Sequence, residues 1–267
     1  MPERSDPGMN STWMRLYRAE RIKGRHTAAN RLWLLMPALT LALAYGISQS
    51  NGTNSAYNWW YTLMMQGMIT LFCCLSGGRD KKRKNRTVLS LPVKMEAVWD
   101  AKLLTGVGTV AVANLLFTAG ILLGGCWLIP RIWILQVMEL TVGQAAGAVA
   151  VMITASLWQV PFCFWMNQKW GLLPTLLINI VMTMAGVVLA VTRLWLVLPW
   201  AILPRLMVSV VGILPNGLPA MPESMTYSQA LTDPANLLPG LLVSLLWFGL
   251  MWAASRRWYG RKGAQTV

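Results

Sequence analysis

The amino-acid sequence predicts an all-α, polytopic membrane protein with six transmembrane helices, an N-terminal interfacial helix, a basic cytoplasmic loop and an extracellular re-entrant segment. Its 267 residues are 55% apolar and only 12% charged, whereas a soluble domain carries about 25% charged residues. The mean hydropathy is +0.49. The apolar residues form long runs, and most Lys and Arg residues lie in the gaps between them. Lipid is therefore the expected environment of most of the chain.

The first 31 residues form a basic tail before the first apolar run. Within this tail, the segment Trp13–His26 is amphipathic at helical spacing, with arginines around one face. The opposite face holds Trp13, Leu16 and Tyr17. A basic amphipathic helix of this kind lies in the headgroup layer and does not cross the membrane.

Six segments have the length and composition of membrane-spanning helices, which need about 20 mostly apolar residues. They are 32–48, 57–75, 103–128, 142–165, 171–192 and 237–255. The expected organisation is a basic tail at 1–31, a membrane domain at 32–255 and a second tail at 256–267. The membrane domain contains a cytoplasmic loop at 76–102 and an extracellular broken-helix region at 193–236.

A seventh apolar stretch, Leu194–Pro215, is also long enough to cross a membrane. It contains Pro199 and Pro204 with Arg205 beside them. Each interior proline removes a helical hydrogen bond that lipid cannot replace. We expect broken or re-entrant helices that pack against the bundle in this region.

The distribution of cations predicts the orientation. Of the 23 Lys and Arg residues, 20 fall on one side of the six predicted spans, and only Arg131, Arg193 and Arg205 fall on the other. Because basic residues accumulate on the cytoplasmic side, both termini are expected in the cytoplasm. The net charge of +14 is explained by this topology, so we expect no nucleic-acid partner.

The sequence lacks the motifs of an enzyme or an ion-coupled carrier. It has no GxxxxGK[ST] loop and no HExxH, and its single histidine, His26, lies in the basic tail. None of the nine acidic residues falls near a predicted membrane midplane, where coupled carriers keep an ionisable group. The four cysteines show no CxxC spacing and are expected to act as small apolar side chains. We expect no catalytic residue, metal or cofactor in this chain, and energy supplied by another subunit.

The cytoplasmic loop combines a run of cations with an amphipathic segment, Asn85–Leu104. Pro92 suits the first turn of a helix, and Val88, Leu89 and Leu91 form a small apolar knob before it. This shape suits docking of a protein. An ordinary interfacial helix fits the same spacing, and the cations alone fit a topological anchor at anionic lipid.

The run "KNRTVLSLPVKMEAVWDAKLL" resembles the loop between spans two and three of type-2 ABC permeases, in particular lantibiotic-immunity permease subunits of the MutE/EpiE kind. The tail "RAERIKGRHTAANRLWLLMP" and the stretch "LPWAILPRLMVSVVGILPNGLPA" are similar to the corresponding parts of that family. One departure is that related exporters often carry a Glu early in the loop, where this chain has Arg79 and Asp80.

The resemblance implies a coupling helix that contacts a separate ABC ATPase subunit, which would hold ATP and Mg²⁺. Its residues would be Asn85, Arg86, Thr87, Leu89, Ser90, Leu91 and Pro92. Leu89 and Leu91 would be the apolar anchors and Arg86 a polar contact. Closure of the ATPase would pass through Pro92 and the following helix into span three.

The resemblance also implies an extracellular exit region for cargo. Its residues would be Pro199, Trp200, Arg205, Pro215 and Asn216. Arg205 would be held in protein or water. A role of Trp200 as an anchor in the aromatic belt of the membrane fits equally well.

These features together predict a permease subunit of an ATP-driven exporter in a bacterial cytoplasmic membrane. By resemblance, its partners would be the ATPase, a second permease subunit, membrane lipid and an amphipathic peptide cargo such as a lantibiotic. The alternatives are an exporter subunit for another amphipathic substrate, or a membrane scaffold or sensor that transports nothing. A secondary carrier is disfavoured because the midplane carboxylate is absent.

Overall fold

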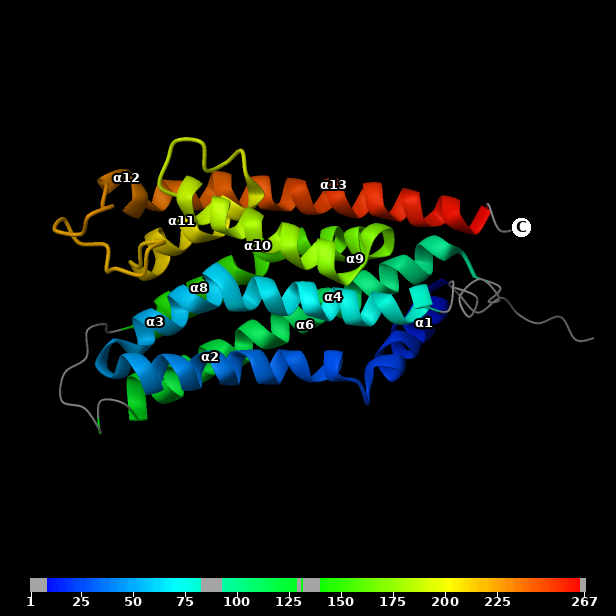
Figure 1. Cartoon of the computed structure of the whole chain (residues 1–267), viewed down its shortest axis with the longest axis horizontal. Helices are drawn as coiled ribbons and strands as arrows, with labels where there is room; N and C mark the ends of the chain where they lie inside the picture. Colours follow the sequence, from blue (N-terminus) through cyan, green and yellow to red (C-terminus); the bar gives the residue numbers. More distant parts are fainter. Residues whose placement is uncertain (1–8, 83–92, 129–130, 132–139, 265–267) are drawn as a thin grey trace, which may run out of the picture.

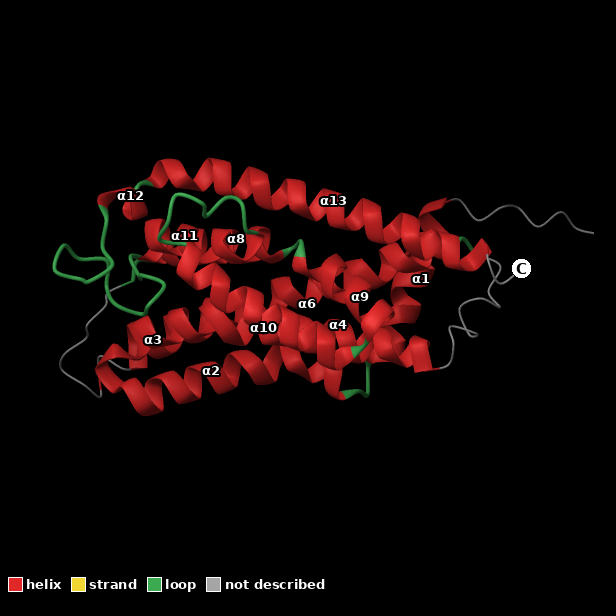
Figure 2. Cartoon of the chain, turned by 45° about the horizontal axis from the view of Figure 1, so that its top comes forward, coloured by secondary structure: helices red, strands yellow, loops and turns green. Residues whose placement is uncertain are grey.

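The computed structural model describes residues 9–82, 93–128, 131 and 140–264. Within these ranges the regular structure is helical, apart from one isolated β-bridge between Ile213 and Pro219, and the long helices form an elongated bundle (Figure 2). The all-α prediction is confirmed for the described part of the chain.

The bundle is built from helices that pack side by side (Figure 1). They are α2 (Leu32–Ser48), α3 (Gly52–Trp59), α4 (Met65–Lys82), α6 (Met95–Leu123), α8 (Val142–Ser156), α9 (Gln159–Trp170), α10 (Leu172–Leu189) and α13 (Leu237–Ala264). The structure also contains α1 (Met9–Gly24), α11 (Pro199–Val211) and α12 (Gln229–Thr232). A π-helical turn at Trp60–Met64 joins α3 to α4, and a second one at Gly124–Leu128 extends α6.

Five segments are long and apolar enough to cross a membrane: Ala28–Asp80, Met95–Leu123, Val142–Trp170, Leu172–Leu189 and Pro234–Arg261. The first has 53 residues and folds back on itself, because α3 and α4 return antiparallel to α2 (Figure 1). These segments identify a membrane protein. The number of six spans stays a prediction.

The outward surface of the bundle supports the same conclusion. On α2, five large apolar side chains are at least 36% exposed: Leu34, Leu35, Leu39, Leu43 and Ile47. A soluble monomer rarely exposes a contiguous apolar surface of this kind. Lipid is the solvent that this surface fits.

Local chemistry explains several helix boundaries. Thr141 and Gln144 form a capping box at the start of α8, which satisfies otherwise unpaired N–H groups. Gly171 separates α9 from α10 at φ 96°, and Gly212 ends α11 at φ 69°. Both values lie in the left-handed region that glycine adopts at low cost.

Glycine also permits the close packing of α6 on α2. A Cβ on Gly120 would lie 2.3 Å from Leu41 Cδ1, and one on Gly124 would lie 3.2 Å from Tyr45 Cε2. This GxxxG pair therefore brings two helices of the same chain together, as the motif does in other membrane bundles.

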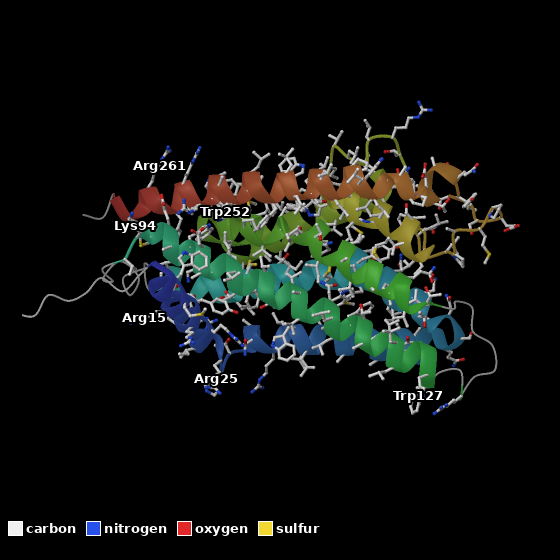
Figure 3. The ribbon with its side chains drawn as sticks, turned by 180° about the vertical axis from the view of Figure 1, so that it is seen from behind. Arg15, Arg25, Lys94, Trp127, Trp252 and Arg261 are labelled. Carbon is white, nitrogen blue, oxygen red and sulfur yellow. The ribbon has the colours of Figure 1, made fainter. Side chains whose placement is uncertain are left out.

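The basic residues gather at one end of the bundle, which we call the charged end. It contains α1, the end of α4, the start of α6, the α9–α10 turn and the end of α13 (Figure 1). Figure 3 shows Arg15, Arg25, Lys94 and Arg261 at this end and Trp127 at the other. The predicted tail at 256–267 is largely a continuation of α13, which is helical to Ala264.

Candidate functional site

The predicted coupling residues lie outside the described part of the chain. They are Asn85, Arg86, Thr87, Leu89, Ser90, Leu91 and Pro92. Of the described helices on either side, α4 ends at Lys82 and α6 begins at Met95, both at the charged end. The candidate site is therefore built here from the side chains around those two helix ends.

A buried group of charges joins α6 to α1 and α4. Lys102 Nζ donates to Glu20 Oε2 at 3.1 Å and to a carboxylate oxygen of Asp80. Lys23 Nζ lies 2.7 Å from Glu20 Oε1 and 3.9 Å from Asp80 Oδ1. We call Glu20, Lys23, Asp80 and Lys102 the Lys102 cluster. It pairs two cations with two anions, and the Lys102 side chain is only 1% exposed.

A second contact ties α4 to the C-terminal end of α1. The guanidinium Nη1 of Arg79 donates to the main-chain oxygen of Lys23. A cation at the last carbonyls of a helix is favoured by the helix dipole. The N-terminal helix α1 is thus attached to the bundle through the Glu20 carboxylate and through the main-chain oxygen of Lys23.

A third set of contacts joins α6 to α13. Asp100 accepts from Trp252 Nε1 at 2.7 Å and from Arg256 Nε at 2.8 Å. Arg256 also lies 3.2 Å from Glu96. We call Glu96, Asp100, Trp252 and Arg256 the Asp100 cluster. Alongside it, Trp99 stacks on a tyrosine of α13 at a centroid distance of 4.5 Å.

The first turns of α6 are therefore held from two sides. The Lys102 cluster connects them to α1 and α4, and the Asp100 cluster connects them to α13. The ion pairs of Lys102 with Glu20 and Asp80 are buried, and buried ion pairs are costly to break. Arg256 in the Asp100 cluster is 38% exposed. A force applied to the segment before Met95 would reach several helices at once. The described residues contain no group of three or more His, Cys, Asp or Glu that could bind a metal ion.

The predicted exit residues Pro199, Trp200 and Arg205 lie on α11, which packs against α8, α10 and α13. Pro199 occupies the first turn of this helix. A Cβ on Gly186 of α10 would lie 2.6 Å from the main-chain carbon of Trp200. α10 ends at Leu189 and α11 begins at Pro199. The turn between them brings Trp200 back against Gly186 of α10.

Contrary to the expectation that each proline breaks the helix, α11 runs without interruption through Pro204 to Val211. A re-entrant segment stays a prediction.

Trp200 is buried inside the bundle, with 8% of its surface exposed. Its Nε1 donates to Asn179 Oδ1 at 2.6 Å, and Asn179 donates to Thr70 on α4. Its ring makes edge-on contacts with Trp158 and Phe162 at 4.5 and 5.3 Å. These contacts fix α11 against α9 and α10.

Arg205 is 6% exposed and is held in protein, as expected. Its guanidinium donates to the main-chain oxygens of Ala190 at 3.2 Å and Ala230 at 2.7 Å. The Trp195 ring lies 5.5 Å from it. Arg205 therefore joins the turn that follows α10 to α12.

Pro215 and Asn216 lie apart from these side chains, in the turn that follows α11. The main-chain oxygen of Pro215 accepts from Asn58 Nδ2 at 3.2 Å, and Asn216 Nδ2 donates to Thr226 Oγ1 at 3.0 Å. The five predicted exit residues thus do not share one surface. Their role in cargo exit stays a prediction.

Sequence reasoning missed the Lys102 cluster, because it treated the acidic residues only as members of tails, loops and interfacial segments. One signal was present: Glu20 is the one acidic residue in the arginine-rich Trp13–His26 segment. Its pairing with Lys102, 82 positions away, is a tertiary contact that spacing does not encode.

No protein family, no characterised protein and no solved structure matches this chain in three separate comparisons. Function is therefore argued from the chain's own residues.

Proposed function

We propose that this protein is a six-span membrane subunit of an ATP-driven exporter, in which a separate ATPase supplies the energy. The observation that carries the proposal is the anchoring of α6. The helix that follows the predicted coupling segment is joined to α1, α4 and α13 by two ion-pair clusters. Such a helix suits the transfer of an ATPase movement into the bundle.

The proposal of six spans is supported by the folding back of Ala28–Asp80, which would make two passes, together with the four other apolar segments. The charged end would face the cytoplasm, because it carries most of the basic residues. The chain would then lie in a bacterial cytoplasmic membrane with both termini inside. A second permease subunit would complete the transporter.

The proposed cargo is a lantibiotic-like amphipathic peptide, and this part rests on the sequence resemblance around residues 84–104. Another amphipathic substrate would use the same coupling arrangement. A scaffold or sensor without transport would need the charged end only as a docking surface.

The test is a complementation experiment in the bacterium that carries the gene. Deletion should raise sensitivity to a lantibiotic, and the wild-type gene should restore resistance. Leu89→Asp and Leu91→Asp should fail to restore it, because a charge would replace each apolar anchor. The control is Met225→Asp, which adds the same charge at a side chain that is 95% exposed.

Two results would contradict the proposal. Full resistance in the Leu89→Asp and Leu91→Asp strains would remove the coupling role of the loop. Unchanged sensitivity of the deletion strain to every lantibiotic tested would remove the peptide cargo.

A further inference from the structure

The α1–α2 connection at the charged end is surrounded by three adjoining hollows. The largest, of about 740 Å³, lies between this connection, α4 and the α9–α10 turn. A second, of about 360 Å³, lies between α1, α4 and α6 and shares Ala29 and Arg79 with the first. A third, of about 490 Å³, shares Tyr17, Arg21 and Asn30 with the second. Each volume lies in the range of small-molecule sites, roughly 300–1,000 Å³.

Four arginines line this set of hollows: Arg18, Arg21, Arg25 and Arg79. None of them forms an ion pair with a carboxylate in the described part of the chain. The one lining carboxylate, Glu20, is already paired with Lys23 and Lys102. The hollows therefore carry positive charge that the described residues do not neutralise, and guanidinium groups bind phosphate strongly.

The wall of the largest hollow is mainly apolar apart from Arg79. It includes Leu75 and Leu172, which are 40% and 41% exposed. Leu75 precedes Arg79 by four positions on α4, so it lies about 6 Å farther into the bundle at 1.5 Å per residue. A ligand with a phosphate at Arg79 would place its apolar part beside Leu75 and Leu172.

We propose that these hollows form a binding site for one anionic phospholipid. Arg79 and Arg21 bind its phosphate, and Arg18 and Arg25 neutralise the remaining headgroup charge. One of its acyl chains lies in the groove between α4 and the α9–α10 turn. Basic pockets between transmembrane helices bind anionic lipid headgroups in this way. The inference needs only the membrane location of the chain and does not depend on the export function.

The structure offers a variant that fills the apolar groove without altering any charge. Gly78 lines the groove, and a Cβ added there meets no atom within 4 Å. Gly78→Leu should therefore occupy the space of the acyl chain, and leucine is favourable in a helix. The matched control is Gly67→Leu on the same helix, where a Cβ also meets no atom within 4 Å and which lies about 16 Å from Gly78 along the axis.

The experiment measures lipid retention by native mass spectrometry on the purified full-length protein. The probes are phosphatidylglycerol and phosphatidylcholine with identical acyl chains. We expect one retained phosphatidylglycerol, and binding weakened about tenfold by Arg79→Gln or Arg21→Gln through loss of a charge-assisted hydrogen bond. Gly78→Leu should weaken it similarly, and Gly67→Leu should leave it unchanged.

Arg21 is exposed, so Arg21→Gln tests the phosphate contact without a loss of folding. Equal retention of the two lipids would overturn the proposal, as would normal phosphatidylglycerol binding in both Arg21→Gln and Gly78→Leu. Displacement of the lipid by inorganic phosphate would identify an anion site alone and would also overturn it.

Discussion

Replacement of Lys102 by methionine is the sharpest test of the Lys102 cluster. The variant keeps the length of the side chain but removes the ammonium that contacts Glu20 at 3.1 Å and also pairs with Asp80. Two carboxylates, whose side chains are 7% and 10% exposed, then face each other with one cation fewer. Breaking a buried pair in this way costs about 3–5 kcal/mol.

Lys23 determines how much of that stability, about 3–5 kcal/mol, the Lys102→Met variant should lose. It stays 2.7 Å from Glu20 and 3.9 Å from Asp80, so part of the negative charge remains neutralised. We expect destabilisation near the lower bound, about 3 kcal/mol. Lys23→Met is the matched control, because its side chain is 40% exposed and an exposed pair contributes about 1 kcal/mol or less.

The assay is denaturant or thermal unfolding in detergent, combined with hydrogen exchange of α1. Lys102→Met should unfold more easily and should raise exchange in Met9–Gly24. The triple variant Glu20→Gln, Asp80→Asn, Lys102→Met should recover much of the stability, because it leaves no unpaired buried charge. Equal stability of Lys102→Met and Lys23→Met would refute the reasoning.

Three further predictions concern α11 and the orientation of the bundle. Gly186→Ala should destabilise the fold by about 1–3 kcal/mol through a clash with the Trp200 main chain. Gly67→Ala should not, because a Cβ there meets no atom within 4 Å. Equal free energies of unfolding for the two variants would contradict the packing of α11. Arg205→Met should speed limited proteolysis of the turn at 190–198 and of α12, because it removes the hydrogen bonds to Ala190 and Ala230. The exposed Arg193→Met should have no effect. Unchanged proteolysis of both segments in Arg205→Met would argue against their being fixed by this arginine. In whole cells, an impermeant thiol reagent should label Met225→Cys and should reach Arg15→Cys only after permeabilisation, and the reverse pattern would overturn the orientation.

Helix positions were well predicted where an apolar run is bounded by polar residues or glycine. The predicted span 32–48 coincides with α2 because Arg31 and Gln49 flank it. The predicted span 171–192 matches α10 closely, since Gly171 interrupts the helix at its start. The helix expected to lead into the third span is continuous with it, since α6 runs from Met95 to Leu123 and no glycine or proline breaks its first turns.

The contacts between elements were not predictable, because they join residues far apart in the chain. Lys102 precedes a predicted span and is expected at the membrane surface, yet Glu20 and Asp80 allow it to be buried. Trp200 fits a membrane interface by residue type, yet Asn179 provides a buried partner for its indole N–H. In both cases a polar partner on another helix allows the side chain to be buried. The local sequence pattern does not predict that partner.

The central claim is that a separate ATPase acts on the bundle through the segment before α6. The most direct measurement is purification of the intact complex from native membranes, followed by identification of its subunits. The account predicts a Walker-type ATPase that copurifies with the wild-type chain and with Met225→Asp, and is lost from Leu91→Asp. Absence of an ATPase from the wild-type complex, or its retention by Leu91→Asp, would contradict the account.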